Sequence, residues 1–208
     1  IICNDMKVIL YLLFILSVVS CTFSSEPEVL SEAEKLMEDR PDSSLALLNK
    51  NQSDVGSYSK KYRMKYYLLR AEAMNKAYVM MDTLQNLPEV LAYYQSHGTA
   101  GDMMAANYVM GSVYRDRDNS PMALKYYLDA VSKLDTTNIN DVRQASRIYA
   151  QIASLFHDQR LPQRAIGVWH KTIKLAMMCG DTLMAAEAFE KMGYSYAIMN
   201  QHDTARRI

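Results

Sequence analysis

The stretch "MGSVYRDRDNSPMALKYYLDAVSKL", residues 110–134, carries the strongest structural signal in this chain. Gly111 lies three positions before Tyr114, and after a polar run Ala123 lies four positions before Tyr127. Residues three and four apart share one face of an α-helix, so each half pairs a small with a bulky side chain on one face. The polar run ends at a proline, which is tolerated in the first turn of a helix. The stretch therefore predicts two packed helices joined by a short turn.

The same order of small and bulky residues recurs along the chain. After Gly111 the next small landmarks are Ala153 and Gly193, so the spacings are 153 − 111 = 42 and 193 − 153 = 40. A weaker copy begins at Ala71, which lies 111 − 71 = 40 residues earlier. Its later landmarks are Met74, Thr83 and Leu87, and a still earlier copy has Ala33, Leu36, Ser44 and Leu48. Because one helix pair cannot bury its apolar face alone, this period predicts a stack of helix pairs.

Small residues let paired helices approach closely, and the bulky residue one turn away fills the space beside the contact. The predicted packing residues are Gly111, Tyr114, Ala123, Tyr127, Ala153, Phe156, Ala165, Trp169, Gly193, Tyr196 and Ala205. With these residues, the region 28–208 resembles the tetratricopeptide repeat (TPR) family. The resemblance implies an all-α fold, a right-handed superhelical α-solenoid of antiparallel helix pairs. The family's usual period is about 34 residues. The longer period here leaves armadillo- or HEAT-like solenoids as the alternative fold.

Turn signals divide the array into ten expected helices. Ser25 and Glu28 have capping-box spacing, Ser120 precedes a proline as an expected N-cap, and Gly180 with Asp181 is typical of a helix end followed by a helix start. The expected helices are 28–38, 42–50, 57–78, 84–96, 102–117, 121–134, 140–158, 162–178, 182–199 and one that begins near 203.

The first residues indicate export. Residues 1–5 precede the expected start at Met6, and 6–20 is typical of a signal peptide. Its apolar core, 8–16, has 16 − 8 + 1 = 9 residues. That length is well short of the roughly 20 residues that span a bilayer. The motif "VVSC", which ends at Cys21, resembles a bacterial lipobox. The resemblance implies a lipidated Cys21, a tether over 21–27, and attachment to a bacterial membrane in the cell envelope, facing the periplasm or the cell surface. A plain signal peptide and a short buried helix remain alternatives.

Neither charge nor motifs indicate catalysis. Lysine plus arginine equals aspartate plus glutamate, with 23 of each, which gives no support to nucleic-acid binding. No two of the four histidines have the spacing of a helical zinc site, and His157 beside Asp158 has no nucleophile motif to serve. We therefore expect no enzyme activity, cofactor, metal or small-molecule substrate. Cys179 is expected to pack as a small apolar residue.

Three tyrosine doublets could suggest an aromatic ligand site: 66–67, 93–94 and 126–127. Neighbours on a helix point about 100° apart. One tyrosine of each doublet can therefore enter the core while the other reaches the rim, and this interpretation is preferred over a ligand site.

The remaining candidate for function is a surface. In TPR proteins the first helix of each pair lines the concave face, so the resemblance implies a protein or peptide partner bound there by a non-catalytic scaffold. The expected contact residues are Tyr108, Ser112, Arg115, Arg147, Ser154, His157, Glu190 and Tyr194. An alternative function rests on the last stretch, 201–208, which resembles an unfinished repeat. In that hypothesis the array is the extracytoplasmic sensory half of a regulator whose transmembrane and signalling or DNA-binding part follows residue 208.

Overall fold

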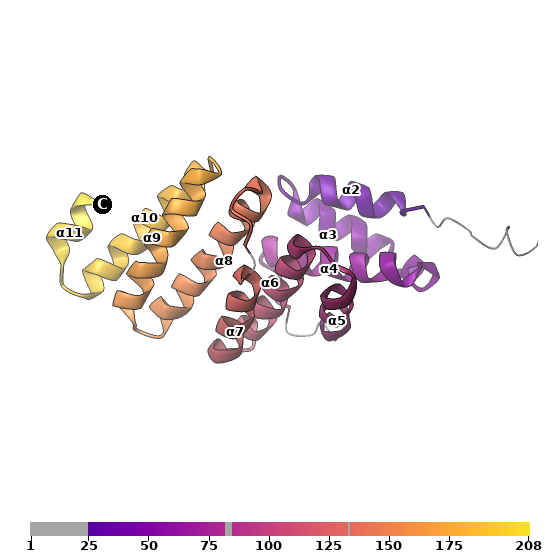
Figure 1. Ribbon diagram of the computed structural model, residues 1–208, viewed down its shortest axis with the longest axis horizontal. Coiled ribbons are helices and arrows are strands. Elements are labelled where there is room, and N and C mark those ends of the chain that lie inside the picture. Colours follow the sequence, from indigo (N-terminus) through magenta and orange to yellow (C-terminus); the bar gives the residue numbers. More distant parts are fainter. Residues whose placement is uncertain (1–24, 82–84, 133) are drawn as a thin grey trace, which may run out of the picture.

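The computed structural model describes residues 25–81, 85–132 and 134–208, and all regular elements in these ranges are helices. The α-helices are α2 (Glu28–Leu36), α3 (Pro41–Lys50), α4 (Lys60–Lys76), α5 (Leu87–His97), α6 (Ala100–Asp116), α7 (Ser120–Val131), α8 (Ile139–Asp158), α9 (Pro162–Met178), α10 (Thr182–Ile198) and α11 (His202–Arg207). A 3-10 helix, η1 (Gln52–Ser57), follows α3. The helices succeed one another along the long axis, with α2 and α11 at opposite ends (Figure 1).

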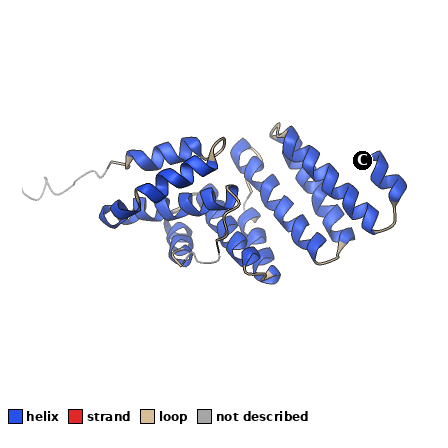
Figure 2. Cartoon of the chain, turned by 180° about the vertical axis from the view of Figure 1, so that it is seen from behind, coloured by secondary structure: helices blue, strands red, loops and turns tan. Residues whose placement is uncertain are grey.

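Helix pairing follows the order of the chain. The pairs are α2 with α3, α4 with α5, α6 with α7, α8 with α9, and α10 with α11, and each pair also contacts the next. The first helices of neighbouring pairs touch as well, as α2 touches α4, α4 touches α6 and α8 touches α10. No strand interrupts the described helices when the chain is seen from behind (Figure 2). The predicted all-α solenoid of antiparallel helix pairs is thus confirmed.

The period of the sequence reappears in the backbone. Each first helix from α4 onward is followed by a residue in the left-handed region: Tyr78, Asp118, Arg160 and Asn200, with φ of 56°, 56°, 58° and 60°. Their spacings are 118 − 78 = 40, 160 − 118 = 42 and 200 − 160 = 40, the same as those of the small landmarks. Even the weak copy that begins at Ala71 therefore ends its first helix in the same way as the others.

One hydrogen bond closes each of these helix ends. The amide that follows the left-handed residue donates to a carbonyl five positions earlier, as in Schellman motifs. The bonds run from Val79 to Met74 (2.8 Å), Asn119 to Tyr114 (2.8 Å), Leu161 to Phe156 (2.9 Å) and Gln201 to Tyr196 (3.0 Å). The acceptors are the bulky landmarks of the four copies, so the packing position and the helix end stay in register.

The closest helix approach occurs between α6 and α7. Gly111 is buried against the ring of Tyr127, and Tyr127 itself is fully buried. A Cβ at position 111 would lie only 2.5 Å from Cε1 of Tyr127. Real Cβ atoms do not approach a ring that closely, so this contact requires glycine. Ala123, one turn before Tyr127, is also fully buried.

The pair α8–α9 packs through alanines. Ala153 and Ala165 are fully buried and Trp169 is nearly so, in one cluster with Ala188 and Met192 of α10. The third copy is looser. At Gly193 an added Cβ would meet only the carbonyl oxygen of Ala205, at an ordinary 3.6 Å. The distance at which the second helix packs against the small residue of the first thus differs between copies.

Two expected helix starts differ in the structure. Ser25 and Glu28 form no capping box, because Pro27 is the N-cap of α2 and no side chain caps that helix. The helix α7 begins one residue earlier than expected, so Asn119 replaces Ser120 as the N-cap and accepts a hydrogen bond from the amide of Met122. Asparagine accepts this bond as well as serine does.

The turn at Gly180–Asp181 agrees with the sequence. Gly180 adopts a left-handed φ of 71°, and Asp181 accepts from the amide of Met184 at the start of α10. A capping box does occur at α6, between Thr99 and Asp102. The reciprocal bonds of this box fix where the helix that carries Gly111 begins.

The N-terminal pairs are shorter than expected. The helix expected over 57–78 is α4, Lys60–Lys76, and the residues before it form η1 instead. The helix expected over 84–96 is α5, Leu87–His97, and the landmark Thr83 lies outside the described residues. The signal peptide over 6–20 and the lipidation residue Cys21 also lie outside them. No helix in the described ranges is long and apolar enough to cross a membrane.

Two helical glycines give a matched test of the packing argument. Gly111→Ala forces a Cβ into Tyr127, so we expect a loss of about 1–3 kcal/mol in the free energy of unfolding. That loss outweighs the gain of about 1 kcal/mol in helix propensity. Gly167 of α9 has no atom within 4 Å of an added Cβ. Gly167→Ala is expected to stabilise the protein by about 0.5–1 kcal/mol. Urea unfolding of both variants measures the two signs, and a Gly111→Ala variant as stable as the wild type contradicts the packing.

Candidate functional site

The first helices and the turns after them carry two groups of charged and polar side chains, one around Arg115 and one around Glu38. We call both groups together the inner network; its members are Glu38, Asn75, Lys76, Arg115, Asp116, Arg147 and Gln151. Arg115 of α6 is the centre of the first group. Its Nε and one terminal nitrogen donate to Oδ1 of Asp116, at 2.9 and 2.8 Å. The other terminal nitrogen donates to Oε1 of Gln151 in α8 at 2.9 Å. The terminal nitrogen that bonds to Asp116 also makes a longer bond of 3.3 Å to Oδ1 of Asn75 in α4. One guanidinium therefore joins three consecutive first helices.

Asp116 extends this contact to the chain after α4. Its Oδ2 accepts a hydrogen bond from the backbone amide of Met81 at 3.0 Å, and Met81 is fully buried. The carboxylate is mostly buried, with 12% of its side chain exposed. Arg115 supplies the opposite charge that such a site requires.

A second arginine, Arg147, bonds to a residue that is far away in the sequence. Arg147 of α8 donates two hydrogen bonds to the carboxylate of Glu38, at 3.2 and 2.9 Å, across 109 residues. Lys76 at the end of α4 adds an ion pair of 2.6 Å to the same carboxylate. Glu38 follows α2, so these bonds connect the first helix pair directly to the fourth. We call the three residues the Glu38 clasp.

The Glu38 clasp has an electrostatic signature. The hydrogen bond from Arg147 is the main cause that lowers the pKa of Glu38 from 4.5 to about 2; partial burial opposes it and Lys76 assists it. The folded-state pKa thus lies below the unfolded value. The clasp contributes fully to stability above pH 4.5, and this contribution is lost as the pH falls toward 2.

Glu72 of α4 has the opposite behaviour. Burial is the main cause that raises its pKa from 4.5 to about 7, opposed by Lys76 and assisted by the charges of Glu34, Glu38 and Asp102. The folded state therefore holds a proton that the unfolded state has lost between these two pH values. Stability from this group falls as the pH rises from 4.5 to 7. The helix α4 thus includes a carboxyl group, that of Glu72, whose pKa lies near neutral pH.

The structure brings three of the expected contact residues together. Arg115 and Arg147 belong to the inner network, and Tyr108 lies partly buried beside Asn75, to which it is hydrogen bonded. Ser112 is different. It is fully buried, and its hydroxyl lies 3.2 Å from that of Tyr127. The expectation that Ser112 faces a partner is therefore wrong, because its position belongs to the seam between α6 and α7.

The other expected contact residues lie farther along the chain. Ser154 and His157 are half-buried on α8, and neither is hydrogen bonded to the described members of the inner network. Glu190 and Tyr194 of α10 line a shallow depression against α11. Tyr194 is 52% exposed, and its hydrogen bond with Glu190 raises its pKa. The eight expected residues thus form no single site.

Several members of the inner network were missed from the sequence: Glu38, Asn75, Lys76 and Gln151. The repeat spacing could have identified two of them. Asn75 lies 40 residues before Arg115, and Lys76 lies 116 − 76 = 40 residues before Asp116, so both occupy equivalent positions in the weaker copy. Glu38 has no such signal, because its bond to Arg147 depends on how the first pair sits in the stack.

The described residues contain no group of three histidine, cysteine, aspartate or glutamate side chains that could hold a metal ion. Cys179 is buried, and its thiol donates to the carbonyl of Ala176 at 3.3 Å. The inner network itself consists of ion pairs and hydrogen bonds.

No protein-family description matches this chain. No curated protein matches it either. Among solved structures, it is similar to the crystal structure of a Podosopora anserina putative kinesin light chain with nearly identical TPR-like repeats. The two share 11% sequence identity at a TM-score of 0.58, over 86% of this chain and 89% of that chain. At this identity the likeness establishes the fold alone, and it favours a TPR-like solenoid over the alternative repeat classes.

The Glu38 clasp gives a test of stability and pH. Glu38→Gln removes the charge that Arg147 and Lys76 share, and because the pair is partly exposed we expect a loss of about 1 kcal/mol at pH 7. The difference between variant and wild type should shrink as the pH falls toward 2, where Glu38 becomes protonated. Urea unfolding across pH measures it.

Asp129→Asn is the matched control, because its partner Lys125 lies one turn away on the exposed face of α7. Its effect should be no more than about 0.5 kcal/mol. A Glu38→Gln variant that is as stable as the wild type at pH 7 and in low salt counts against the clasp.

Proposed function

We propose that this protein is a non-catalytic scaffold that binds a protein or peptide partner along its first helices. The observation that supports the proposal most is the inner network. Polar and charged side chains from α4, α6 and α8 converge on Arg115, whereas the seams between paired helices are apolar. TPR-like arrays generally mediate protein–protein interaction, and the fold similarity makes this the first class of function to test.

The chemistry of this face suits an extended peptide or a helix with polar side chains. Arg147 and Lys76 hold the carboxylate of Glu38, and Glu72 is a carboxyl group that makes no hydrogen bond within the described residues. A partner would therefore meet side chains of both signs of charge on this face. Hydrogen bonds in which one group is ionised are stronger than neutral ones and add specificity.

Site-specific photo-crosslinking tests the location of the partner. A photoreactive residue at Ser154 of α8 or Glu190 of α10 should yield crosslinked partner in cells that carry the full chain. The matched control is Lys174, which is exposed on the second helix α9. Excess untagged protein should suppress the products from positions 154 and 190. Equal yield from Lys174, or yield that the untagged protein does not suppress, overturns the proposed face.

We further propose that the scaffold is a lipoprotein attached to a bacterial membrane through Cys21. The support is the lipobox-like motif and the apolar run before it. Acyl chains contribute about 0.8 kcal/mol per buried CH₂ group, which is enough to hold a protein on a membrane when two or more chains are present.

Cell fractionation tests the anchor. Cys21→Ser should move the protein from the membrane fraction to the soluble fraction, because the acyl acceptor is lost. Cys179→Ser serves as the control, since that cysteine is buried in the array and should leave the distribution unchanged. Retention of Cys21→Ser in membranes to the same degree as the wild type would falsify lipidation at this residue.

A further inference from the structure

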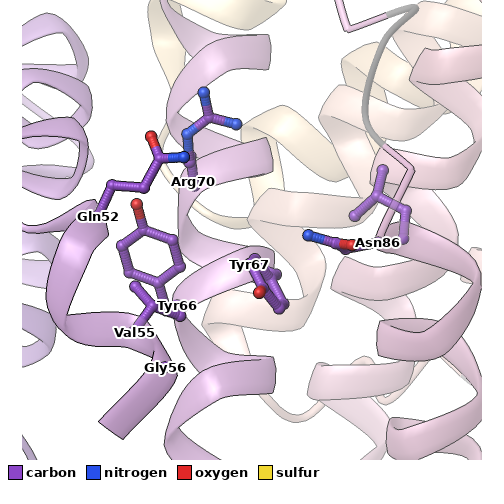
Figure 3. A pocket seen from close by; sticks show the side chains of 8 residues that line it. Gln52, Val55, Gly56, Tyr66, Tyr67, Arg70 and Asn86 are labelled. Atoms are coloured by element: carbon purple, nitrogen blue, oxygen red, sulfur yellow. The ribbon is translucent and has the colours of Figure 1, made fainter. Parts of the chain in front are cut away.

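A small pocket of about 210 Å³ lies between η1, α4 and the start of α5 (Figure 3). It shares no residue with the inner network, so it is independent of the partner face proposed above. Its lining divides into an apolar floor and a polar rim. Both parts include residues from η1, from α4 and from the start of α5.

The floor is fixed in place. Val55, Tyr66 and Leu87 are all nearly fully buried. The hydroxyl of Tyr66 donates to the carbonyl of Leu48 at 3.0 Å, which holds the ring. The neighbouring Tyr67 meets the Tyr66 ring edge to face, with centroids 5.6 Å apart. Tyr66 itself is nearly fully buried, so the half-buried Tyr67 is the ring that remains open to the pocket. A ring held in this way binds flat apolar groups with little loss of side-chain entropy.

The rim carries a cation, Arg70, that has no acidic partner among the described residues. Arg70 lies beside Gln52 at one end of the pocket, and Asn86 points toward Tyr67 from the other side (Figure 3). The Nε of Arg70 donates to the amide oxygen of Asn49 at 2.9 Å, and no described carboxylate pairs with this guanidinium. None of the described lining residues is acidic. The side chain of Asn86 makes no capping bond to α5, although Asn86 is the N-cap residue.

Arg70 differs in this respect from the two arginines of the inner network. Arg115 and Arg147 both have their charge matched by a carboxylate. Arg70 is only partly exposed and has a neutral partner. A planar guanidinium matches a carboxylate in geometry as well as in charge.

We propose that this pocket binds a small organic anion with a flat apolar body, an aromatic carboxylate, with the ring on the tyrosine floor and the carboxylate at Arg70. The volume supports one ring and one acid group, since a cavity of about 150 Å³ holds benzene. The carboxylate can belong to a free acid or to the C-terminal phenylalanine of another chain. The ligand is bound and not transformed.

A pair of glycine variants tests the location. No atom lies within 4 Å of a Cβ added at Gly56, which lines the pocket, and the same holds for Gly167 on the exposed face of α9. A Cβ therefore fits at both positions, and leucine is the matched substitution. In NMR titrations of the full chain with benzoate, Gly56→Leu should weaken binding at least tenfold, because its side chain fills the pocket. Gly167→Leu should bind as the wild type does.

Probe chemistry tests the role of Arg70. Benzoate should bind at least tenfold more tightly than benzamide, which keeps the ring and lacks the charge, and acetate should not bind. Arg70→Gln should abolish the difference between benzoate and benzamide. The proposal is overturned if benzoate does not bind the wild type, if benzamide binds equally well, or if Gly56→Leu leaves benzoate binding unchanged.

A short peptide that ends in phenylalanine distinguishes the two sources of the carboxylate. Binding as tight as that of benzoate, lost on C-terminal amidation, identifies a chain terminus as the ligand. Binding at least tenfold weaker identifies a free acid. Either result is independent of crosslinking at Ser154 and Glu190, so this pocket and the proposed partner face can fail separately.

Discussion

The structure depends on one steric constraint, the contact between a side chain of minimal size on a first helix and a ring on the second. At Gly111 this contact leaves no room for a Cβ. The two helices of a pair are thereby held close enough for their apolar faces to exclude water over their length. Every later feature follows from how these pairs stack, because a pair by itself leaves one apolar face uncovered.

The apolar seams of small and aromatic residues determine where charged side chains can lie. Charged groups are costly to bury without partners, so they are displaced from the seams to the faces where first helices meet. Arg115 shows the result: it lies between three first helices and satisfies its donors with Asp116, Gln151 and Asn75. The polar contacts between repeats thus form where the apolar contacts within repeats leave room for them.

Periodicity made the fold predictable, and its limits explain what was missed. The landmarks Gly111, Ala153 and Gly193 repeat in the sequence, and the left-handed residues after each first helix repeat with the same spacings. A local pattern therefore sufficed for the ten helices. The cap at Asn119 was missed because asparagine and serine are equally good caps and stand side by side. In each tyrosine doublet one ring is buried, namely Tyr66, Tyr94 and Tyr127, as the helical angle between neighbours requires.

The sites were less predictable because they depend on contacts between repeats. Ser112 was assigned to the surface from its offset alone, yet the approach of Tyr127 buries it. Glu38 and Arg147 are 109 residues apart, and no local pattern connects them.

The length of the helices accounts for the unusual period. The helices α6, α9 and α10 each have 17 residues and α8 has 20. At 1.5 Å per residue, a helix of this length extends over roughly 25–30 Å. In the pair α8–α9 the extra residues thus lie within the helices and widen the face that this repeat contributes, whereas α5 and α7 have only 11 and 12 residues. A wider face separates its functional groups.

Arg147 lies in the middle of α8 and reaches the first pair, whereas Arg115 lies at the end of α6 and joins its neighbours. Two arginines on adjacent first helices can therefore do different work: one holds neighbouring repeats together, and the other connects repeats that are distant in the chain.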